Sequence, residues 1–325
     1  MKKVILIFLA LGLVLTFTHY ASAKTKFPVK PVNLYVGFSA GGMTDVIARG
    51  LTAEGEKILG QKILVVNKPG AGGAVAAALV AKTKPDGYTI QISPDTPLTR
   101  APHLRKLAYD PMKDLTFISR IGVWKNGFVV LTDSQFKTWN DVVKWAKDHP
   151  GELKYGSPGS GTTPDIIMAV IAKREGFTFR STPFQGDTPN MAALLGGHTM
   201  VAGSSTGAWS KYVRAKKMRL LLVFEEEGVD EFPEAPTFKK IGYDIETPTT
   251  AIVFGPKGIP EEVVNKLNDM FTKAAQSKTF KSIAESMELM AVDQPLKGAE
   301  IDKYVKRAYS LYKKYVEEAG LAKKK

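Results

Sequence analysis

Short apolar stretches alternate with longer amphipathic stretches from residue 32 onward. Residues 32–36, 63–66 and 88–92 are rich in aliphatic and aromatic side chains and have the length of strands. Glycine turns such as Gly41-Gly42 separate these stretches from the helical patterns that follow them. Strands that alternate with helices through tight turns predict a mostly parallel sheet that is covered by helices.

The same alternation begins again near residue 128 and predicts a second α/β unit. Its strands are expected at 128–131, 153–155, 181–184, 200–202 and 219–224.

The last eighty residues differ, because after one strand at 252–255 their periodicity is helical. A helical segment with few strands of its own must pack on an existing sheet, so we expect it to return to the first unit. The fold class predicted is therefore α/β with two lobes and two crossovers, near 122–123 and 247–250. Lobe 1 would comprise residues 24–122 plus 248–325, and lobe 2 residues 123–247.

The N-terminus has the pattern of a secretory signal peptide. Lys2 and Lys3 precede an apolar run at 4–17, which is too short for a membrane span, and Ala21-Ser22-Ala23 follows. We expect cleavage after Ala23 and a mature periplasmic chain that begins at Lys24. That chain is long enough to bury a sufficient core although it contains no cysteine.

The formal net charge is +13, of which the leader contributes two lysines. An excess of bases can indicate nucleic acid, a membrane surface or the attraction of small anions. Apart from the tail at 323–325 the lysines are scattered, and no basic motif interleaved with aromatic residues occurs. The charge therefore favours attraction of small anions, and no nucleic-acid partner is expected.

Three glycine-bearing loops stand between a predicted strand and a predicted helix. They lie at 38–45, 156–163 and 185–188. Such loops direct free backbone N–H groups and the positive end of a helix toward one point. In open α/β sheets they gather at the carboxyl ends of the strands, where ligands bind. Together they predict an anion-binding site.

Two further motifs resemble those of enzymes. Residues 156–163 have the glycine spacing of a phosphate-binding loop, but Thr162 stands where the lysine is required. Residues 203–207 match the G-x-S-x-G elbow of a serine hydrolase, with Ser205 as nucleophile. The histidine base of that fold follows the serine in the chain, whereas all four histidines precede Ser205: His19, His103, His149 and His198. No catalytic residue is therefore predicted, and an exported serine hydrolase that uses Ser205 stays the alternative.

Metal ligation is not expected either. No two histidines have ligand spacing, and without cysteine there is no thiolate. We predict no metal and no cofactor.

Several motifs in a fixed order make the chain resemble one family, the substrate-binding receptors of tripartite tricarboxylate transporters, which include the Bug proteins. The resemblance extends from residue 27 almost to the C-terminus. Its motifs lie at 36–45, 67–73, 84–89, 155–161, 183–186, 194–197 and 255–260.

This resemblance implies a type II-like Venus-flytrap fold that binds a small carboxylate between its lobes on backbone groups, hydroxyls and water. It also implies that the protein is a monomer, not an enzyme, and that it delivers its ligand to membrane permease subunits. A sensing role, in which the receptor signals to a membrane kinase, is an alternative. The residues implied to bind ligand are Phe38, Ser39, Ala40, Gly41, Gly42 and Asp45 from lobe 1, with Ser160, Thr162, Thr163, Gln185, Gly186 and Ser204 from lobe 2.

Two residues depart from the family pattern. A histidine is common where Asp165 stands, and an aspartate is common where Ser204 stands. The loss of a carboxylate at 204 would suit a more anionic or bulkier ligand, and the gain of one at 165 argues against it. The identity of the carboxylate therefore stays open.

Overall fold

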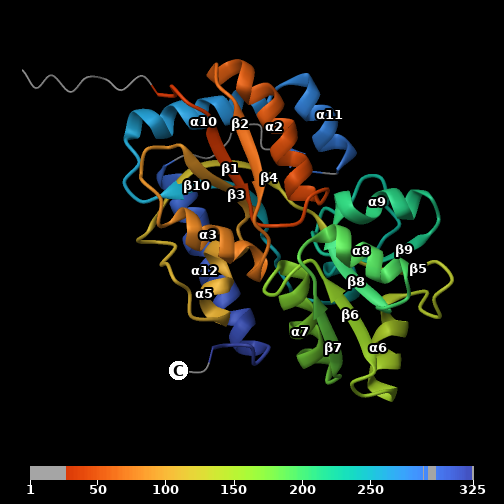
Figure 1. Cartoon of the computed structure of the whole chain (residues 1–325). Coiled ribbons are helices and arrows are strands. Elements are labelled where there is room, and N and C mark those ends of the chain that lie inside the picture. Colours follow the sequence, from red (N-terminus) through yellow and green to blue (C-terminus); the bar gives the residue numbers. More distant parts are fainter. Residues whose placement is uncertain (1–26, 288, 292–297, 324–325) are drawn as a thin grey trace, which may run out of the picture.

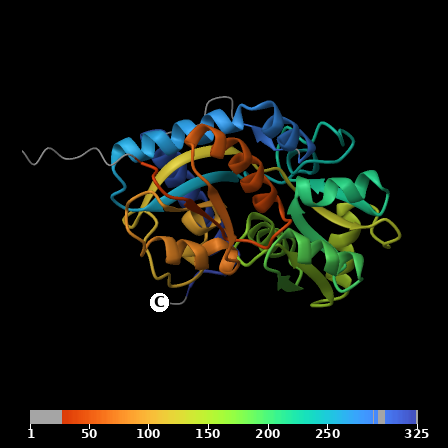
Figure 2. The ribbon, with the colours of Figure 1, turned by 45° about the horizontal axis from the view of Figure 1, so that its top comes forward.

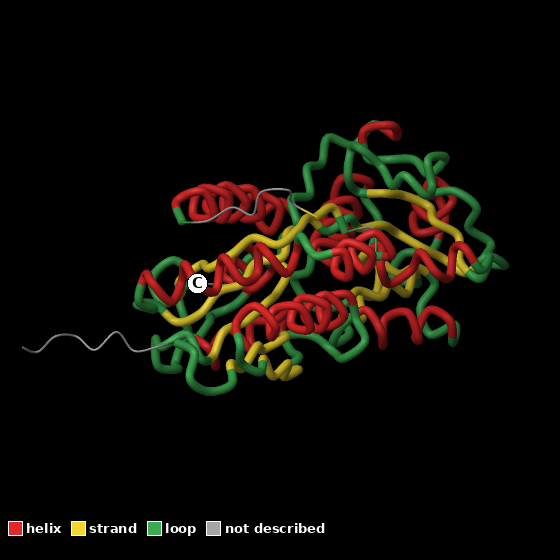
Figure 3. Tube along the Cα trace, turned by 90° about the horizontal axis from the view of Figure 1, so that it is seen from above, coloured by secondary structure: helices red, strands yellow, loops and turns green. Residues whose placement is uncertain are grey.

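The computed structural model describes residues 27–287, 289–291 and 298–323, which form two α/β lobes side by side (Figure 1). Each lobe consists of one sheet and the helices that cover it, as the view from above also shows (Figure 3). The predicted leader lies outside the described residues. Within them, no helix is long and apolar enough to cross a membrane.

The first lobe is built on a six-stranded sheet with the strand order β11-β4-β10-β3-β1-β2. Strand β1 is parallel to β2 and β3, whereas β10 is antiparallel to β3 and β4, and β11 is antiparallel to β4. The strands are β1 (Val32–Val36), β2 (Ile63–Asn67), β3 (Thr89–Pro94), β4 (Leu115–Val123), β10 (Thr250–Pro256) and β11 (Met290–Ala291).

Helices cover both faces of this sheet because its central strand is apolar on both sides. Ala251 and Val253 of β10 belong to the core under α2, α10 and α11, while Ile252 and Phe254 belong to the core on the opposite face. Figure 2 shows α10 running along the outside of the first lobe beside α2. The helices are α2 (Met43–Leu59), η1 (Ala71–Gly73), α3 (Ala74–Val80), α4 (Thr96–Thr99), α5 (Ala101–Leu104), α10 (Glu261–Ala275), α11 (Lys278–Ser286) and α12 (Ala299–Glu318).

The second lobe has a five-stranded sheet with the order β7-β6-β8-β5-β9. Its strands β6, β7 and β8 are parallel, and β5 is antiparallel to both β8 and β9. The strands are β5 (Asn126–Leu131), β6 (Leu153–Ser157), β7 (Phe179–Pro183), β8 (Val201–Ser205) and β9 (Met218–Val223).

The helices of the second lobe also lie on both faces of their sheet. Phe128 and Val130 of β5 pack with α6 and α7, whereas Val129 packs with α8 and α9. These helices are α6 (Trp139–Asp148), α7 (Thr163–Glu175), α8 (Asp187–Leu195) and α9 (Thr206–Arg214), with a short η2 (Lys239–Ile241) after β9.

The two-lobed α/β fold that the sequence predicts is confirmed, but the sheets are mixed rather than mostly parallel. The reason is that β10 and β5, which directly follow the crossovers, run antiparallel to both of their neighbours. Strand β4 and helices α4 and α5 are not predicted from the sequence. Both faces of β4 are covered, so it lacks the alternation of a half-exposed strand, and the two helices have only four residues each.

The two crossovers are hydrogen-bonded to each other. The chain leaves the first sheet at the end of β4 and returns to it at the start of β10. These two strands pair antiparallel up to Val123 and Thr250, and Trp124 N–H donates to Thr249 O at 2.9 Å. The lobes are thus joined by two short segments that lie side by side, which is the geometry of a hinge.

Helix α12 packs against both lobes. Ile301 and Val305 in its first half belong to the core of the first lobe, while Tyr312 and Val316 in its second half belong to the core of the second. The exact division of the chain into lobes stays a prediction. Because α12 packs on both lobes, it does not belong to one lobe alone.

We predict that Tyr312 contributes strongly to stability. Its ring is fully buried, and its hydroxyl donates to Pro248 O at 3.1 Å. Tyr312→Ala should lower the free energy of unfolding by about 3–5 kcal/mol, because a large buried side chain is removed. Tyr312→Phe should cost only about 0.5–1.5 kcal/mol. Urea unfolding measures both, with Lys314→Ala on the exposed face of α12 as the control. Equal costs for the two Tyr312 variants would contradict the prediction.

Candidate ligand-binding site

A cavity lies between the two lobes, where helices α2, α7 and α8 begin. In this closed arrangement its volume is about 30 Å³, which is room for one or two water molecules. An organic ligand can therefore enter only if the lobes separate. The cavity is lined by Phe38, Thr44, Pro94, Thr96, Trp124, Asn126, Pro158, Thr162, Thr163, Pro164, Asp187, Ser205 and Thr249.

Backbone contacts between the lobes close one side of the cavity. Ser39 N–H donates to Gln185 O at 2.8 Å, and Thr188 Oγ1 donates to Ala40 O at 3.3 Å. Gly186 permits this approach, because a Cβ at that position would meet the backbone nitrogen of Ser39 at 3.0 Å. The predicted site residues of these two loops thus contact each other directly in the closed structure.

Helices α2 and α7 begin with the same arrangement of a glycine and an aspartate. Gly41 N–H donates to Asp45 Oδ2 at 2.9 Å, and Gly161 N–H donates to Asp165 Oδ2 at 2.8 Å. Both glycines have a positive φ, +73° and +82°. A carboxylate in the first turn satisfies a free N–H and interacts favourably with the helix dipole. Each lobe therefore presents a loop of the same construction to the cleft.

Asp45, one of the predicted ligand-binding residues, does not line the cavity. Its carboxylate also accepts from Arg49 Nε at 3.0 Å and from Asn67 Nδ2 at 2.9 Å, all within the first lobe. Burial alone would raise the pKa of Asp45, but the hydrogen bonds from Arg49, Gly41 and Asn67 lower it below its ordinary value. Asp45 thus holds the loop in place as an ionised group.

Asp165 and Ser160 support the corresponding loop of the second lobe. Asp165 also accepts from the hydroxyls of Ser157 at 3.3 Å and Ser181 at 3.2 Å, and its burial raises its pKa above the ordinary value. Ser160, another predicted ligand-binding residue, does not line the cavity. Its carbonyl and hydroxyl oxygens accept from Arg105 Nη2 across the lobes, at 3.3 and 2.8 Å.

Thr162 and Thr163 do line the cavity, at the start of α7. The hydroxyl of Thr162 donates to Gly159 O at 2.8 Å. The hydroxyl of Thr163 lies 2.6 Å from that of Thr249, which belongs to the second crossover, and accepts from Arg100 Nη2 at 2.8 Å. Thr163 therefore connects the cavity wall to a buried cation in the other lobe.

Arg100 lies directly behind the cavity and is fully buried. It pairs with Asp95 Oδ1 at 2.9 Å, donates to Pro248 O at 3.0 Å, and places its guanidinium 3.8 Å from the centre of the Tyr312 ring. Burial would lower the pKa of Arg100, but the Asp95 carboxylate raises it, so the group stays charged. One side chain of the first lobe thus contacts the second lobe, a crossover and α12.

Among the described residues that line the cavity, Asp187 alone has an acidic or basic side chain. Its Oδ1 accepts a short hydrogen bond from Ser204 Oγ, and its Oδ2 accepts from Met43 N–H, at the start of α2, at 3.4 Å. Burial raises the pKa of Asp187, against the lowering effect of these donors. Ser204, a predicted ligand-binding residue, does not line the cavity, because it is turned toward Asp187. Its neighbour Ser205 does line the cavity, and its backbone N–H and hydroxyl also lower the pKa of Asp187.

Three of the predicted residues line the cavity: Phe38, Thr162 and Thr163. The others hold its loops together or close its edge. The sequence reasoning missed Arg100, Thr249 and Trp124 and gave Asp187 no role. Arg100 and Trp124 stand in no motif that distinguishes them, and Thr249 is only part of a predicted crossover. Asp187 belongs to the predicted glycine-bearing loop at 185–188, and the structure begins α8 at this residue.

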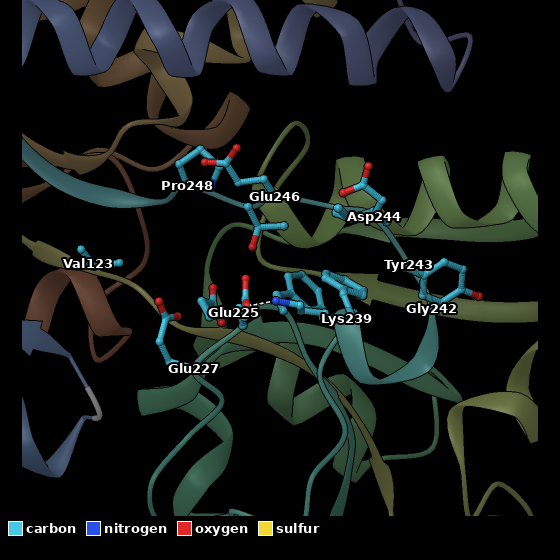
Figure 4. A pocket seen from close by; sticks show the side chains of 14 residues that line it. Val123, Glu225, Glu227, Lys239, Gly242, Tyr243, Asp244, Glu246 and Pro248 are labelled. Carbon is cyan, nitrogen blue, oxygen red and sulfur yellow. Dashed lines mark hydrogen bonds and ion pairs between the residues drawn. The ribbon is translucent and has the colours of Figure 1, made fainter.

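A larger groove lies beside the crossovers and is separate from the cavity (Figure 4). Its volume is about 760 Å³, and it is lined by the carboxylates of Glu225, Glu226, Glu227, Asp244 and Glu246. Glu225 accepts from the backbone N–H of Asn126 at 2.9 Å, and Asn126 itself lines the cavity. This groove has the charge opposite to that expected for an anion site.

Two lobes, two adjacent crossovers and a cavity between the starts of helices define a two-lobed solute-binding protein. Residues 47–320 match the model of the family described as tripartite tricarboxylate transporter family receptor. The chain belongs to this family. It is also 37% identical over 301 residues to the Cupriavidus necator protein "UPF0065 protein in gbd 5'region", which covers 92% of this chain and 90% of that one.

Two solved structures with the same fold carry carboxylates. The chain is similar to MatC from Rhodopseudomonas palustris, described with bound malate, with a TM-score of 0.85, 26% identity and coverage of 89% of this chain and 100% of that one. It is also similar to an R. palustris protein described with adipate, with a TM-score of 0.85, 25% identity and coverage of 91% and 99%.

We predict that Glu225 makes stability depend on pH. Burial raises its pKa from 4.5 to about 8, so the folded protein binds this proton more tightly than the unfolded chain. The contribution of Glu225 to stability should therefore fall as pH rises from about 4.5 to 8 and then level off. As pH rises through that range, the melting temperature of Glu225→Gln should increase relative to that of the wild type. Glu227→Gln, at an exposed position of the same groove, is the control. A constant difference between wild type and Glu225→Gln would contradict the prediction.

Proposed function

We propose that the protein is a periplasmic receptor that binds a small carboxylate-bearing organic anion between its lobes and delivers it to the membrane subunits of a tripartite tricarboxylate-type transporter. The observation that carries this proposal is the cavity between the lobes, with walls from the starts of α2, α7 and α8. Malate and adipate, named for two proteins of the same fold, support a carboxylate as the ligand.

The chemistry of the cavity suits a ligand that is held by neutral donors. Six residues with hydroxyl groups line it, Thr44, Thr96, Thr162, Thr163, Ser205 and Thr249, and none of the described lining residues is lysine, arginine or histidine. Helix α7 directs its N-terminal end toward the cavity, and Arg100 donates to Thr163 from behind. A hydroxyl that accepts from a guanidinium is a better donor to a carboxylate, because its own hydrogen is polarised.

Release and uptake would follow from motion of the lobes about the paired crossovers. The bonds that span the lobes are few and polar, as between Ser39 and Gln185 and between Arg105 and Ser160. Such contacts contribute modestly because water can replace them when the lobes part. A ligand that contacts both lobes would shift the equilibrium toward the closed form.

A binding role is also favoured over hydrolysis by Ser205. The described histidines lie elsewhere: His103 against Tyr309, His149 against Trp145, and His198 beside Gly196. Ser205 therefore has no histidine base within the described residues, and we propose that the protein is not an enzyme. We further propose export through cleavage after Ala23 and a monomeric mature chain.

We predict that one carboxylate binds per chain and raises the melting temperature, because it binds the folded state alone. A thermal-shift screen of small carboxylates, followed by calorimetry of those that stabilise the protein, tests this. The methyl ester of each hit is its control and should give no shift. Equal stabilisation by acid and ester, or ester hydrolysis that Ser205→Ala abolishes, would contradict the proposed function.

We predict that Gly72→Ala blocks closure. Gly72, in the first lobe, has φ +64°, and a Cβ there would lie 2.8 Å from Ser160 O of the second lobe. Overpacking of this size costs about 1–3 kcal/mol, so affinity should fall about ten- to a hundredfold. Small-angle scattering should show no compaction when ligand is added.

The matched control is Gly60→Ala, with φ +72° and no atom within 4 Å of the added Cβ. It carries the same backbone strain but should leave affinity unchanged. A Cβ at residue 72 would also lie 2.8 Å from Thr96 Cγ2, within the first lobe, and could destabilise that lobe by itself. The free energy of unfolding of both variants is therefore measured in parallel. Equal affinities for the two variants would place the ligand outside this cleft.

A further inference from the structure

Strand β9 is the outer strand of the second sheet, and its first half has an open edge. Thr132 N–H donates to Lys217 O at 3.1 Å, which shows which backbone groups at the start of β9 face β5. Because these groups alternate along an antiparallel pair, Met218 and Leu220 direct their own N–H and C=O groups away from the sheet. Among the described residues, none makes a hydrogen bond to these outward groups.

The chain itself already uses the same edge a few residues later. Val223 N–H donates to Pro236 O at 2.9 Å, and Val223 forms a parallel bridge with Thr237. A segment of the chain therefore lies beside the end of β9 and leaves the first half of the strand uncovered. An unpaired strand edge is a template for another extended segment.

A groove of about 480 Å³ lies along this open part of the edge. Met218 and Leu220 line it, together with apolar side chains such as Trp139 and Val213. Its lining residues come from segments 132–139, 213–221 and 234–236, all within the second lobe. Motion of the lobes about the crossovers therefore leaves the groove intact.

Basic side chains outnumber acidic ones at the groove. Lys137, Lys216 and Arg219 line it, and Glu234 is the one acidic residue among the described residues that do so. Two polar side-chain atoms of lining residues, Arg219 Nε and Thr132 Oγ1, are buried without a hydrogen-bond partner in the part of the chain that the structure describes. Buried polar atoms are normally paired. The groove therefore offers both positive charge and unused hydrogen-bonding capacity.

Lys216 occupies a position where glycine is usual. It follows α9, and its φ is +54°. The N–H of Lys216 donates to Val213 O and that of Lys217 to Tyr212 O, both at 2.9 Å, which is the pattern that ends a helix with a left-handed residue. Glycine adopts this φ without steric cost, whereas lysine does not. A lysine in a strained position at the rim of the groove indicates that its charge is used there.

We propose that this groove binds an extended acidic segment of a partner protein, which adds to β9 as a further strand. The backbone of that segment exchanges hydrogen bonds with Met218 and Leu220, and its carboxylates pair with Lys216 and Arg219. At about 3.3 Å per residue, the two open positions match about three residues of the segment. The inference does not depend on which ligand the cleft binds.

The same observations argue against other occupants. A second copy of this chain would bring its own Lys216, Lys217 and Arg219 against these residues, and like charges across paired strands are destabilising. An anionic membrane surface could neutralise the lysines. Its headgroups, however, do not supply the regular row of donors and acceptors that pairs with an open strand edge. An acidic polypeptide supplies both the charge and this row.

The test is an NMR titration of the ¹⁵N-labelled mature chain with a pentapeptide of sequence EVTVE whose ends are blocked. The amide shifts should be largest at Lys216, Met218 and Leu220. Two matched peptides separate the backbone from the charge. A version that is N-methylated at its three central residues cannot donate to the edge of β9, and a KVTVK version reverses the charge. Both should bind at least tenfold more weakly.

Variants of the protein test the basic rim. Arg219→Gln should weaken binding of EVTVE about tenfold, as expected for one charge-assisted hydrogen bond, and Lys216→Gly about two- to fivefold. Because glycine relieves the backbone at this position, Lys216→Gly should not lower the melting temperature, so its weaker binding cannot come from unfolding. The control is Lys281→Gln, at an exposed position of α11 in the other lobe, which should leave the affinity unchanged.

Several results would overturn the inference, and none of them bears on carboxylate binding in the cleft. If the methylated peptide binds as tightly as EVTVE, the groove only attracts charge and the strand edge takes no part. Shifts at Thr162 and Thr163 in place of β9 would show that the peptide enters the cleft. If EVTVE causes no shifts at millimolar concentration, the groove does not bind acidic segments. Vesicles of phosphatidylglycerol that then bind the wild type but not Lys216→Gly would assign the basic rim to a membrane surface.

Discussion

The arrangement of the two lobes depends on the buried ion pair of Arg100 and Asp95. The guanidinium of Arg100 contacts the first turn of α7, the carbonyl of Pro248 in a crossover and the ring of Tyr312 in α12. Asp95, which pairs with it, belongs to the first lobe. A charge that is removed from water needs hydrogen-bond partners in place of water. In the closed arrangement these contacts hold the hinge, α12 and one wall of the cavity together.

The cleft itself is formed by two loops of the same construction, one from each lobe. In each, a glycine with positive φ donates its N–H to an aspartate four residues later, and the helix begins between them. These aspartates satisfy the loop from within and do not line the cavity, so they hold the backbone in shape. The described residues that do line the cavity bring mainly hydroxyl-bearing and apolar side chains to it.

The charge of the whole chain and the charge of the cleft have opposite signs. The protein carries a net charge of +13, yet the described residues that line its cavity include one carboxyl group and no basic side chain. The lysines can draw small anions toward the surface from a distance. Within the cleft, however, the lining residues act over short distances, so their chemistry rather than the net charge determines what the cavity offers to a bound molecule.

The sequence by itself determined the two α/β units, the segment that returns to the first of them, and the loops before α2, α7 and α8. These follow from local patterns: hydrophobic periodicity, glycine turns and first-turn side chains. Only the tertiary structure decided that Asp45 and Ser160 support loops, that Asp187 enters the cleft and that Arg100 lies behind it. Arg100 meets Thr163 and Pro248, which are 63 and 148 residues away in the chain. A side chain's charge is evident in the sequence, but its partner and its burial arise when distant segments pack together.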